Sequence, residues 1–246
     1  GAKKTNPAKI HKISQHPVAK FAEKCLKTAD ALRKYLPNDG EKYIPYPNCK
    51  DKSIGVLSGC FPYKVQKNDD EMQKKAIEDF VSDELKFGNM YSVGRHIAPW
   101  YASWKATVYA DISDEKAYYS LKQATESAGC FAEMFEINEK DCVFRPWFTT
   151  AAGSFIYAVN RMLVQREEDV LYIAPALPES EKSFSFKLSA YGNITVEVTV
   201  ENLKLTDFKI IRNGGENGKI KLKFPKHIDV SDAVKKGIIK QDDLYI

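Results

Sequence analysis

The sequence predicts a protein in which a helical region is followed by an antiparallel β-region. Up to about residue 166 the apolar residues recur every three or four positions, which is the period of an α-helix with one buried face. After that point the apolar runs are short and alternate with polar residues, as in 194–200, where Ile and Val alternate with Thr and Glu. The expected parts are a flexible tail over 1–12, a helical domain over 13–166, an antiparallel β-domain over 167–228 and a C-terminal tail over 229–246.

Helical spacing and end signals divide the first region into helices. Pro37 and Asn38-Asp39-Gly40 end the first helix, and Pro99 suits the first turn of the third, where its missing N–H would have had no partner. Ser113 is the expected cap of the fourth helix. Only a few residues separate the third and fourth helices, so we expect an antiparallel hairpin. The expected ranges are 16–36, 69–87, 97–111 and 114–128.

A further helix ends near Gln165. Small residues at 151–154 allow it to start close to another backbone, and Ser154 is a suitable N-cap. Its apolar residues keep helical spacing and are expected to face the core. These residues are Phe155, Ile156, Val159, Met162 and Leu163.

The β-region is expected to form a small antiparallel β-sandwich beside the helices. Its apolar runs are separated by Gly192-Asn193 and Gly214-Gly215, which are typical of tight turns. The expected strands are 170–173, 183–191, 194–200, 205–212 and 219–224. The tail after them is expected to be partly helical.

Composition excludes several classes of protein. With 43% hydrophobic and 28% charged residues, the body of the chain is expected to fold. The net charge of +4 arises from 37 basic and 33 acidic residues that are mixed along the chain, so we expect no nucleic-acid partner. No apolar run approaches the roughly 18 residues of a membrane-spanning helix. The five cysteines show no paired spacing and are expected to be free thiols, although a Cys130–Cys142 link stays open.

One stretch resembles a known enzyme family. The segments Phe131-Ala132-Glu133-Met134-Phe135, Arg145-Pro146-Trp147-Phe148-Thr149-Thr150-Ala151-Ala152-Gly153-Ser154-Phe155 and Asn160-Arg161-Met162-Leu163 follow one another. Together they resemble the last hairpin of the six-hairpin (α/α) toroid of glycoside hydrolases. The stretch is similar to glucoamylase, maltose-phosphorylase-type and α-fucosidase-type enzymes.

Two further segments agree with this resemblance. Residues 100–104 with 114–118 resemble a penultimate toroid hairpin, and 170–178 resembles the crossing into a C-terminal sheet. The likeness covers about residues 13–224. It implies a partial toroid followed by a β-sandwich, and hydrolysis of a glycosidic bond in an oligosaccharide or polysaccharide by acid and base catalysis.

The resemblance also implies catalytic residues. Glu133 matches the base of the glucoamylase-type motif, and Glu136 is the second candidate. The α-fucosidase-type enzymes carry an Asp in the turn before the last helix, but here 148–151 holds no carboxylate, which puts that type of inversion in doubt. The general acid of these families lies upstream of any segment that matches. A surface carboxylate with no catalytic role is the competing interpretation of Glu133.

Aromatic rings and hydrogen-bond donors around this stretch suit a sugar site. Rings stack on the apolar face of a pyranose, while arginine, histidine and threonine donate to its hydroxyl groups. Trp100 is four residues from Trp104, so the two rings are also expected as a shared core stripe, and ion pairs compete for the arginines. The candidate substrate-binding residues are Trp147, Arg145, Thr149, Thr150, Trp100, Arg95 and His96.

Neither a metal ion nor another cofactor is expected, because no ligand spacing or nucleotide-binding loop is present. The rival hypothesis is a non-catalytic carbohydrate-binding or scaffold protein that keeps the hydrolase fold. A third hypothesis, an enzyme that cleaves the bond with phosphate in place of water, is less favoured because the sequence shows no convincing anion-binding loop. Half a toroid leaves an open apolar flank, which a second copy or missing upstream residues would cover. A signal peptide removed before Gly1 would make the protein extracellular or periplasmic.

Overall fold

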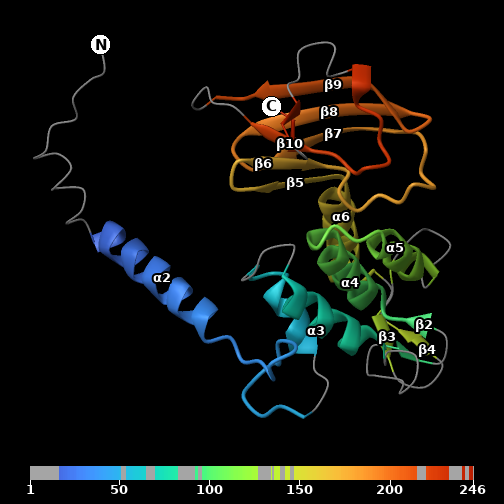
Figure 1. The fold of residues 1–246 in the computed structure, drawn as a ribbon. Coiled ribbons are helices and arrows are strands. Elements are labelled where there is room, and N and C mark those ends of the chain that lie inside the picture. Colours follow the sequence, from blue (N-terminus) through green and yellow to red (C-terminus); the bar gives the residue numbers. More distant parts are fainter. Residues whose placement is uncertain are drawn as a thin grey trace, which may run out of the picture.

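The computed structural model confirms the order of helices first and sheets second. In the described part of the chain, helices are followed by two small sheets, one antiparallel and one mixed (Figure 1). The described residues are 17–50, 54–64, 70–82, 92–93, 96–126, 134, 136–138, 142–144, 147–214, 220–232, 240–241 and 244–245.

Helix α4 is the centre of the helical region. Nearly all of its side chains are buried, because α5 and α6 pack on it from different sides (Figure 1). Lys105 of α4 donates to Gln123 of α5 over 2.7 Å, and the short turn between these helices makes the expected antiparallel hairpin. The helices are α2 (Pro17–Lys34), the 3-10 helix η1 (Ile54–Gly59), α3 (Glu71–Ser82), α4 (Pro99–Asp111), α5 (Lys116–Glu126) and α6 (Thr149–Leu163).

The expected helix caps at Ser113 and Ser154 are wrong. Before α5 the Oδ1 atom of Asp114 accepts the N–H of Lys116 at 2.8 Å, while Ser113 has a φ of +58°. An Asp accepts such a bond with a formal charge near the positive end of the helix, so it is the better partner. Helix α6 starts at Thr149 and has no side-chain cap, which leaves Ser154 inside the helix.

Helix α6 buries a narrower face than its apolar residues suggest. Ala151, Ala158 and Met162 are its buried residues, whereas Ile156 is 62% exposed, contrary to expectation. A Cβ atom on Gly153 would meet no atom within 4 Å, so this glycine does not serve the close backbone approach we expected. One face of α6 is therefore open within the described chain.

Two short hairpins escaped the sequence analysis. Strands β1 (Ser92–Val93) and β2 (His96–Ile97) pair directly before α4, and β3 (Glu136–Asn138) and β4 (Cys142–Phe144) pair shortly before α6. Strands of two or three residues are too short for an alternating pattern to show.

The expectation of a purely antiparallel β-region is wrong in one respect. Strand β10 (Lys221–Lys223) pairs with β6 (Val170–Ile173) in parallel, with Lys223 opposite Tyr172. Parallel neighbours need a long crossover, and the three-stranded sheet supplies it. The mixed sheet has the order β11-β12-β10-β6-β5, and β7-β8-β9 form the other. The remaining strands are β5 (Val164–Glu167), β7 (Phe184–Ala190), β8 (Ile194–Glu201), β9 (Lys204–Arg212), β11 (Lys240–Gln241) and β12 (Leu244–Tyr245).

The C-terminal segment belongs to the mixed sheet. We expected a partly helical tail; residues 231–232 are helical, and farther on β12 pairs with β10, and β11 pairs with β12. The alternating pattern of β8 is confirmed, since Ile194, Val196, Val198 and Val200 are all buried. These side chains join the residues of α4 and β6 in one continuous apolar core.

A buried polar network joins the ends of α4, α6 and β5. The Nε atom of Arg161 donates to Oδ1 of Asp111 at 2.7 Å, and its Nη2 atom donates to Asp111 and to Gln165. The amide of Gln165 in turn donates to the carbonyl of Ala110. Burial raises the pKa of Asp111, whose side chain is 5% exposed, while the charge of Arg161 pulls it down. Because residues near both carboxyl ends meet, α4 and α6 run parallel.

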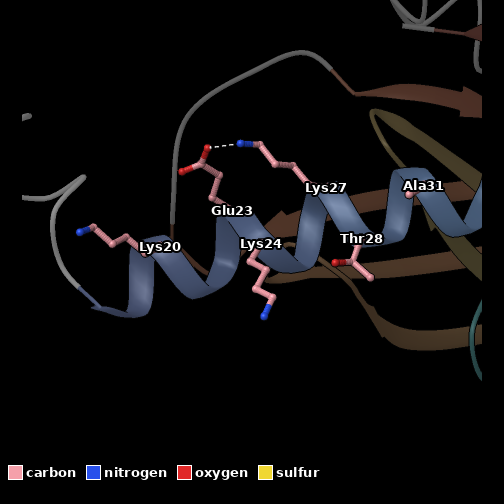
Figure 2. A pocket seen from close by; sticks show the side chains of 6 residues that line it. All are labelled: Lys20, Glu23, Lys24, Lys27, Thr28 and Ala31. Atoms are coloured by element: carbon pink, nitrogen blue, oxygen red, sulfur yellow. Dashed lines mark ion pairs between the residues drawn. The ribbon is translucent and has the colours of Figure 1, made fainter.

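Helix α2 carries an apolar stripe that no described residue covers. It extends away from the other helices (Figure 1), and none of its residues is buried. Val18, Phe21, Leu26 and Leu32 are 61–68% exposed on one face. The hollow shown in Figure 2 lies on the opposite, polar face, where Glu23 and Lys27 form an ion pair of 2.8 Å. An amphipathic helix gains most of its stability from packing of its apolar face, so α2 is incomplete as it stands.

None of the helices in the described ranges has the length and apolar character that crossing a membrane requires.

Replacing Arg161 with Met tests the buried network. The substitution leaves Asp111 buried without its charged partner, which is expected to lower the free energy of unfolding by about 3–5 kcal/mol in urea denaturation. Lys187→Met is the control, because it breaks an ion pair with Glu197 in which the lysine is largely exposed, and it should change the free energy of unfolding far less than Arg161→Met does. Equal losses for the two variants would contradict a structural role for the buried pair.

Candidate functional site

The candidate residues gather at one end of the helical region. Hairpin β1–β2 leads into α4 and hairpin β3–β4 comes shortly before α6, so parallel packing of the two helices brings the hairpins to the same end. Strand β1 contacts β3, and β3 contacts α4. This end lies opposite the sheets, which follow the carboxyl end of α6 (Figure 1). We call it the amino-end surface, made of β1–β4 and of the first turns of α4 and α6.

The structure places six of the nine candidates on this surface. Trp100 lies in the first turn of α4, Trp147 directly precedes α6, and Thr149 and Thr150 are the first residues of α6. His96 is on β2 opposite Val93, and Glu136 is on β3 opposite Phe144; for these two the structure describes the backbone. Glu133, Arg145 and Arg95 lie outside the described residues.

Trp147 has an unusual backbone. Its φ is +65°, in the left-handed region that bulky residues rarely adopt. Such a conformation costs about 1–3 kcal/mol and persists when surrounding structure holds it. The next residue, Phe148, donates its N–H to the carbonyl of Met134 at 2.9 Å, which ties the turn to the segment before β3. The indole is 65% exposed, so the strained turn presents a large aromatic face to solvent.

The start of α6 offers hydrogen-bond donors. The residue before the helix, Phe148, provides no side-chain cap, and the N–H groups of Thr149 and Thr150 have no acceptor among the described residues. The first N–H groups of a helix need partners from outside it and carry a partial positive charge. Both threonine side chains are exposed beside them. This arrangement can bind the oxygen atoms of a hydroxylated or anionic ligand.

Trp100 and Trp104 form the shared stripe that their spacing predicts. Their ring centroids are 5.9 Å apart, and both are half-buried. The Nε1 atom of Trp104 donates to the carbonyl of Phe61 at 2.9 Å, and the Phe61 ring lies 4.9 Å from that of Tyr157 on α6. Sequence reasoning missed Phe61 and Tyr157, although the aromatic content of the 41–67 loop suggested an ordered loop. The loop packs on the sides of α4 and α6.

Cys60, next to Phe61, is a buried thiol. Burial and the negative charge of Asp111 raise its pKa to about 12, although Lys64 opposes the shift. Cys25 on α2 is exposed and, like Cys60, has no disulfide partner. Cys60 is therefore held as a small apolar residue and is not a nucleophile at neutral pH.

Possible ligands for a metal ion do not converge in the described ranges, where no group of three or more His, Cys, Asp or Glu side chains lies together. No protein-family model and no curated protein matches this chain.

Thiol modification tests the environment of Cys60. At pH 8 iodoacetamide should label Cys25 readily and leave Cys60 almost unlabelled, because a thiol of pKa about 12 is nearly all protonated. Peptide mass spectrometry of the labelled chain measures both sites, and labelling in urea serves as the control in which Cys60 should react. Comparable labelling of the two cysteines in the native chain would show that Cys60 is not buried as described.

Proposed function

We propose that the chain is the C-terminal half of a toroid-type glycoside hydrolase, with helical hairpins of a partial (α/α) toroid followed by a β-sandwich. Parallel α4 and α6, with α5 returning antiparallel beside α4, support this proposal, because a ring of helical hairpins requires that alternation. The substrate is an oligosaccharide or polysaccharide bound at the amino-end surface. We further propose that the enzyme works outside the cell or in the periplasm.

The observation that carries this proposal is the backbone of Trp147. The left-handed backbone of this bulky residue destabilises the folded state, and the ring, which lies in solvent, does not offset that strain by packing. Stacking of the exposed indole on a pyranose, whose axial C–H face is apolar, would explain why the strained backbone is kept. The N–H groups at the start of α6, immediately after it, are suited to the hydroxyl oxygens of the same sugar.

The proposed catalytic base is Glu133, with Glu136 as the second candidate. Inverting hydrolysis needs two carboxyl groups about 6.5–9.5 Å apart, one to activate a water and one to protonate the leaving oxygen. Glu136 lies on β3, and β3 contacts α4, which supports placing a carboxylate at the amino-end surface. The general acid is expected from the part of the toroid upstream of the matching segments.

A second candidate function is carbohydrate binding without turnover. It is favoured by the same exposed Trp147 and requires no general acid. The two candidates differ in what the carboxylates do, so a substitution at Glu133 separates them.

Hydrolysis of an oligosaccharide panel tests the catalytic assignment. Glu133→Gln should lower turnover by about 10²–10⁴-fold while leaving sugar affinity within a few-fold, because the amide keeps the shape but cannot act as a base. Glu201→Gln, the same substitution at the exposed end of β8, is the matched control and should retain activity. Sugar binding with no turnover in any variant would favour the carbohydrate-binding protein. The absence of both binding and turnover would contradict both candidate functions.

Trp147→Gly separates binding from folding. Glycine adopts a positive φ without strain, so thermal unfolding should show no loss of stability, while sugar affinity should fall by at least about tenfold. Tyr191→Ala, which removes an 87% exposed ring from the β7–β8 turn, is the control and should bind like the unchanged chain. A Trp147→Gly variant that binds sugar normally would contradict a stacking role.

The same proposal accounts for the open apolar faces. The stripe of α2 and the exposed face of α6, with Ile156 62% and Tyr157 42% exposed, form the flank that further helices of the toroid or a second copy would cover.

Sedimentation of the chain tests this flank. We expect self-association, or binding of an apolar dye, that Phe21→Asp with Leu32→Asp abolishes because both side chains lie on the apolar stripe. Lys24→Asp with Ala31→Asp, on the polar face of α2, is the control and should change neither property. A monodisperse monomer that binds no dye would contradict the flank.

A further inference from the structure

A cavity of about 340 Å³ lies beyond the carboxyl end of α4, where the helices meet the mixed sheet, and is thus separated from the amino-end surface by the length of the helical layer. It opens where the parallel strands β6 and β10 end, and the segments after both strands line it. Its third wall is the turn between α4 and α5, through Ser113 and Glu115. Ligand sites in sheets with parallel strands form beyond their carboxyl ends, because adjacent chains leave the sheet there. The volume is at the lower limit of small-molecule sites, which span about 300–1,000 Å³.

Several residues that line this cavity are basic. Lys223 and Lys226 line it together with His227, whereas Glu115 is its one carboxylate. In the part of the chain that the structure describes, neither lysine has a carboxylate within 4.0 Å, whereas Lys187, Lys204 and Lys221 of the same β-region each form an ion pair. The Nζ atom of Lys223 lies 5.5 Å from the ring centre of Tyr172, a cation–π contact that leaves its hydrogen-bond donors available.

Other residues that line the cavity are apolar. Pro175, Leu177, Phe224 and Pro225 line it, and Leu177 is buried. Tyr172 also lines the cavity, and its ring contacts Lys223. A ligand that matches both the basic and the apolar residues has a compact ring and an anionic group. Glu115 in the lining disfavours ligands with several negative charges and can accept a hydrogen bond from a hydroxyl group.

We propose that this cavity binds a small organic anion, a ring-sized body that carries one carboxylate or phosphate group. The ring packs against Tyr172, Phe224 and the prolines, and the anionic group receives hydrogen bonds from Lys223 and Lys226. Charge-assisted bonds of this kind are the strong ones. The site is independent of the proposed hydrolase function, because it shares no residue with the amino-end surface.

Titration calorimetry on the full chain tests the site with glucuronate, glucose 6-phosphate, glucose and inorganic phosphate. One of the two sugar anions should bind with a stoichiometry of one, and the anion that binds identifies the anionic group as carboxylate or phosphate; binding of both supports the shared chemistry. Glucose, which lacks the charge, should bind at least about tenfold more weakly.

Lys223→Ala with Lys226→Ala should weaken the binding of that anion by at least about tenfold. Lys182→Ala with Lys209→Ala is the matched control, because it changes the net charge equally on exposed residues away from the cavity, and it should retain the affinity. The proposal is overturned if neither sugar anion binds at millimolar concentration, if both double variants lose affinity equally, or if inorganic phosphate binds as tightly as the sugar anion.

Discussion

The buried contact between Asp111 and Arg161 is the constraint on which the arrangement of this protein depends. It joins the last residue of α4 to the last turn of α6, and Gln165 extends it into β5 through the carbonyl of Ala110. A charged pair without water is weak support for stability in itself, because desolvation offsets its attraction. The pair instead fixes how far α6 is shifted along α4, because the guanidinium can reach the carboxylate at only one axial position of the two helices.

That register determines what lies at both ends of the helices. At the amino ends it brings two hairpins and two uncapped helix starts side by side, which creates a surface with rings, N–H donors and a strand that carries a carboxylate. At the carboxyl ends, α6 passes directly into β5, and the turn after α4 meets the ends of β6 and β10. The two proposed ligand sites, the amino-end surface and the cavity beyond the carboxyl end of α4, are thus separated by the length of the helical layer.

The sequence predicted long elements well and short or non-local ones poorly. Strand β8 has a pattern that repeats often enough to identify both its type and its buried face, and α4 was predicted as a helix although nearly all of its side chains are buried. The hairpin strands at His96 and Glu136 are too short for any period, and the parallel pairing of β6 with β10 depends on residues far apart in the chain. The stripe of α2 was recognised as apolar, but periodicity does not say what covers it.

The candidate site divides in the same way. Residue types pointed to Trp147, Thr149 and Thr150, and the structure brings them to one surface with Trp100. The left-handed backbone of Trp147 could not be predicted, because nothing in Arg145-Pro146-Trp147 demands it and the bond between Phe148 and Met134 holds it in place. Phe61 and Tyr157 were missed since their contact joins a loop to a helix about a hundred residues away.

The chain contains three tryptophans, and all lie in or beside the proposed sugar site. Their indole N–H signals in a nitrogen–proton correlation spectrum therefore test the central claim directly, with a panel of α- and β-linked oligosaccharides as ligands. We predict that one class of sugar shifts the signals of Trp147 and Trp100, while Trp104, whose N–H is bonded to Phe61, shifts less. Unchanged signals of Trp147 and Trp100 with every sugar at millimolar concentration would contradict a carbohydrate site at this end of the helices.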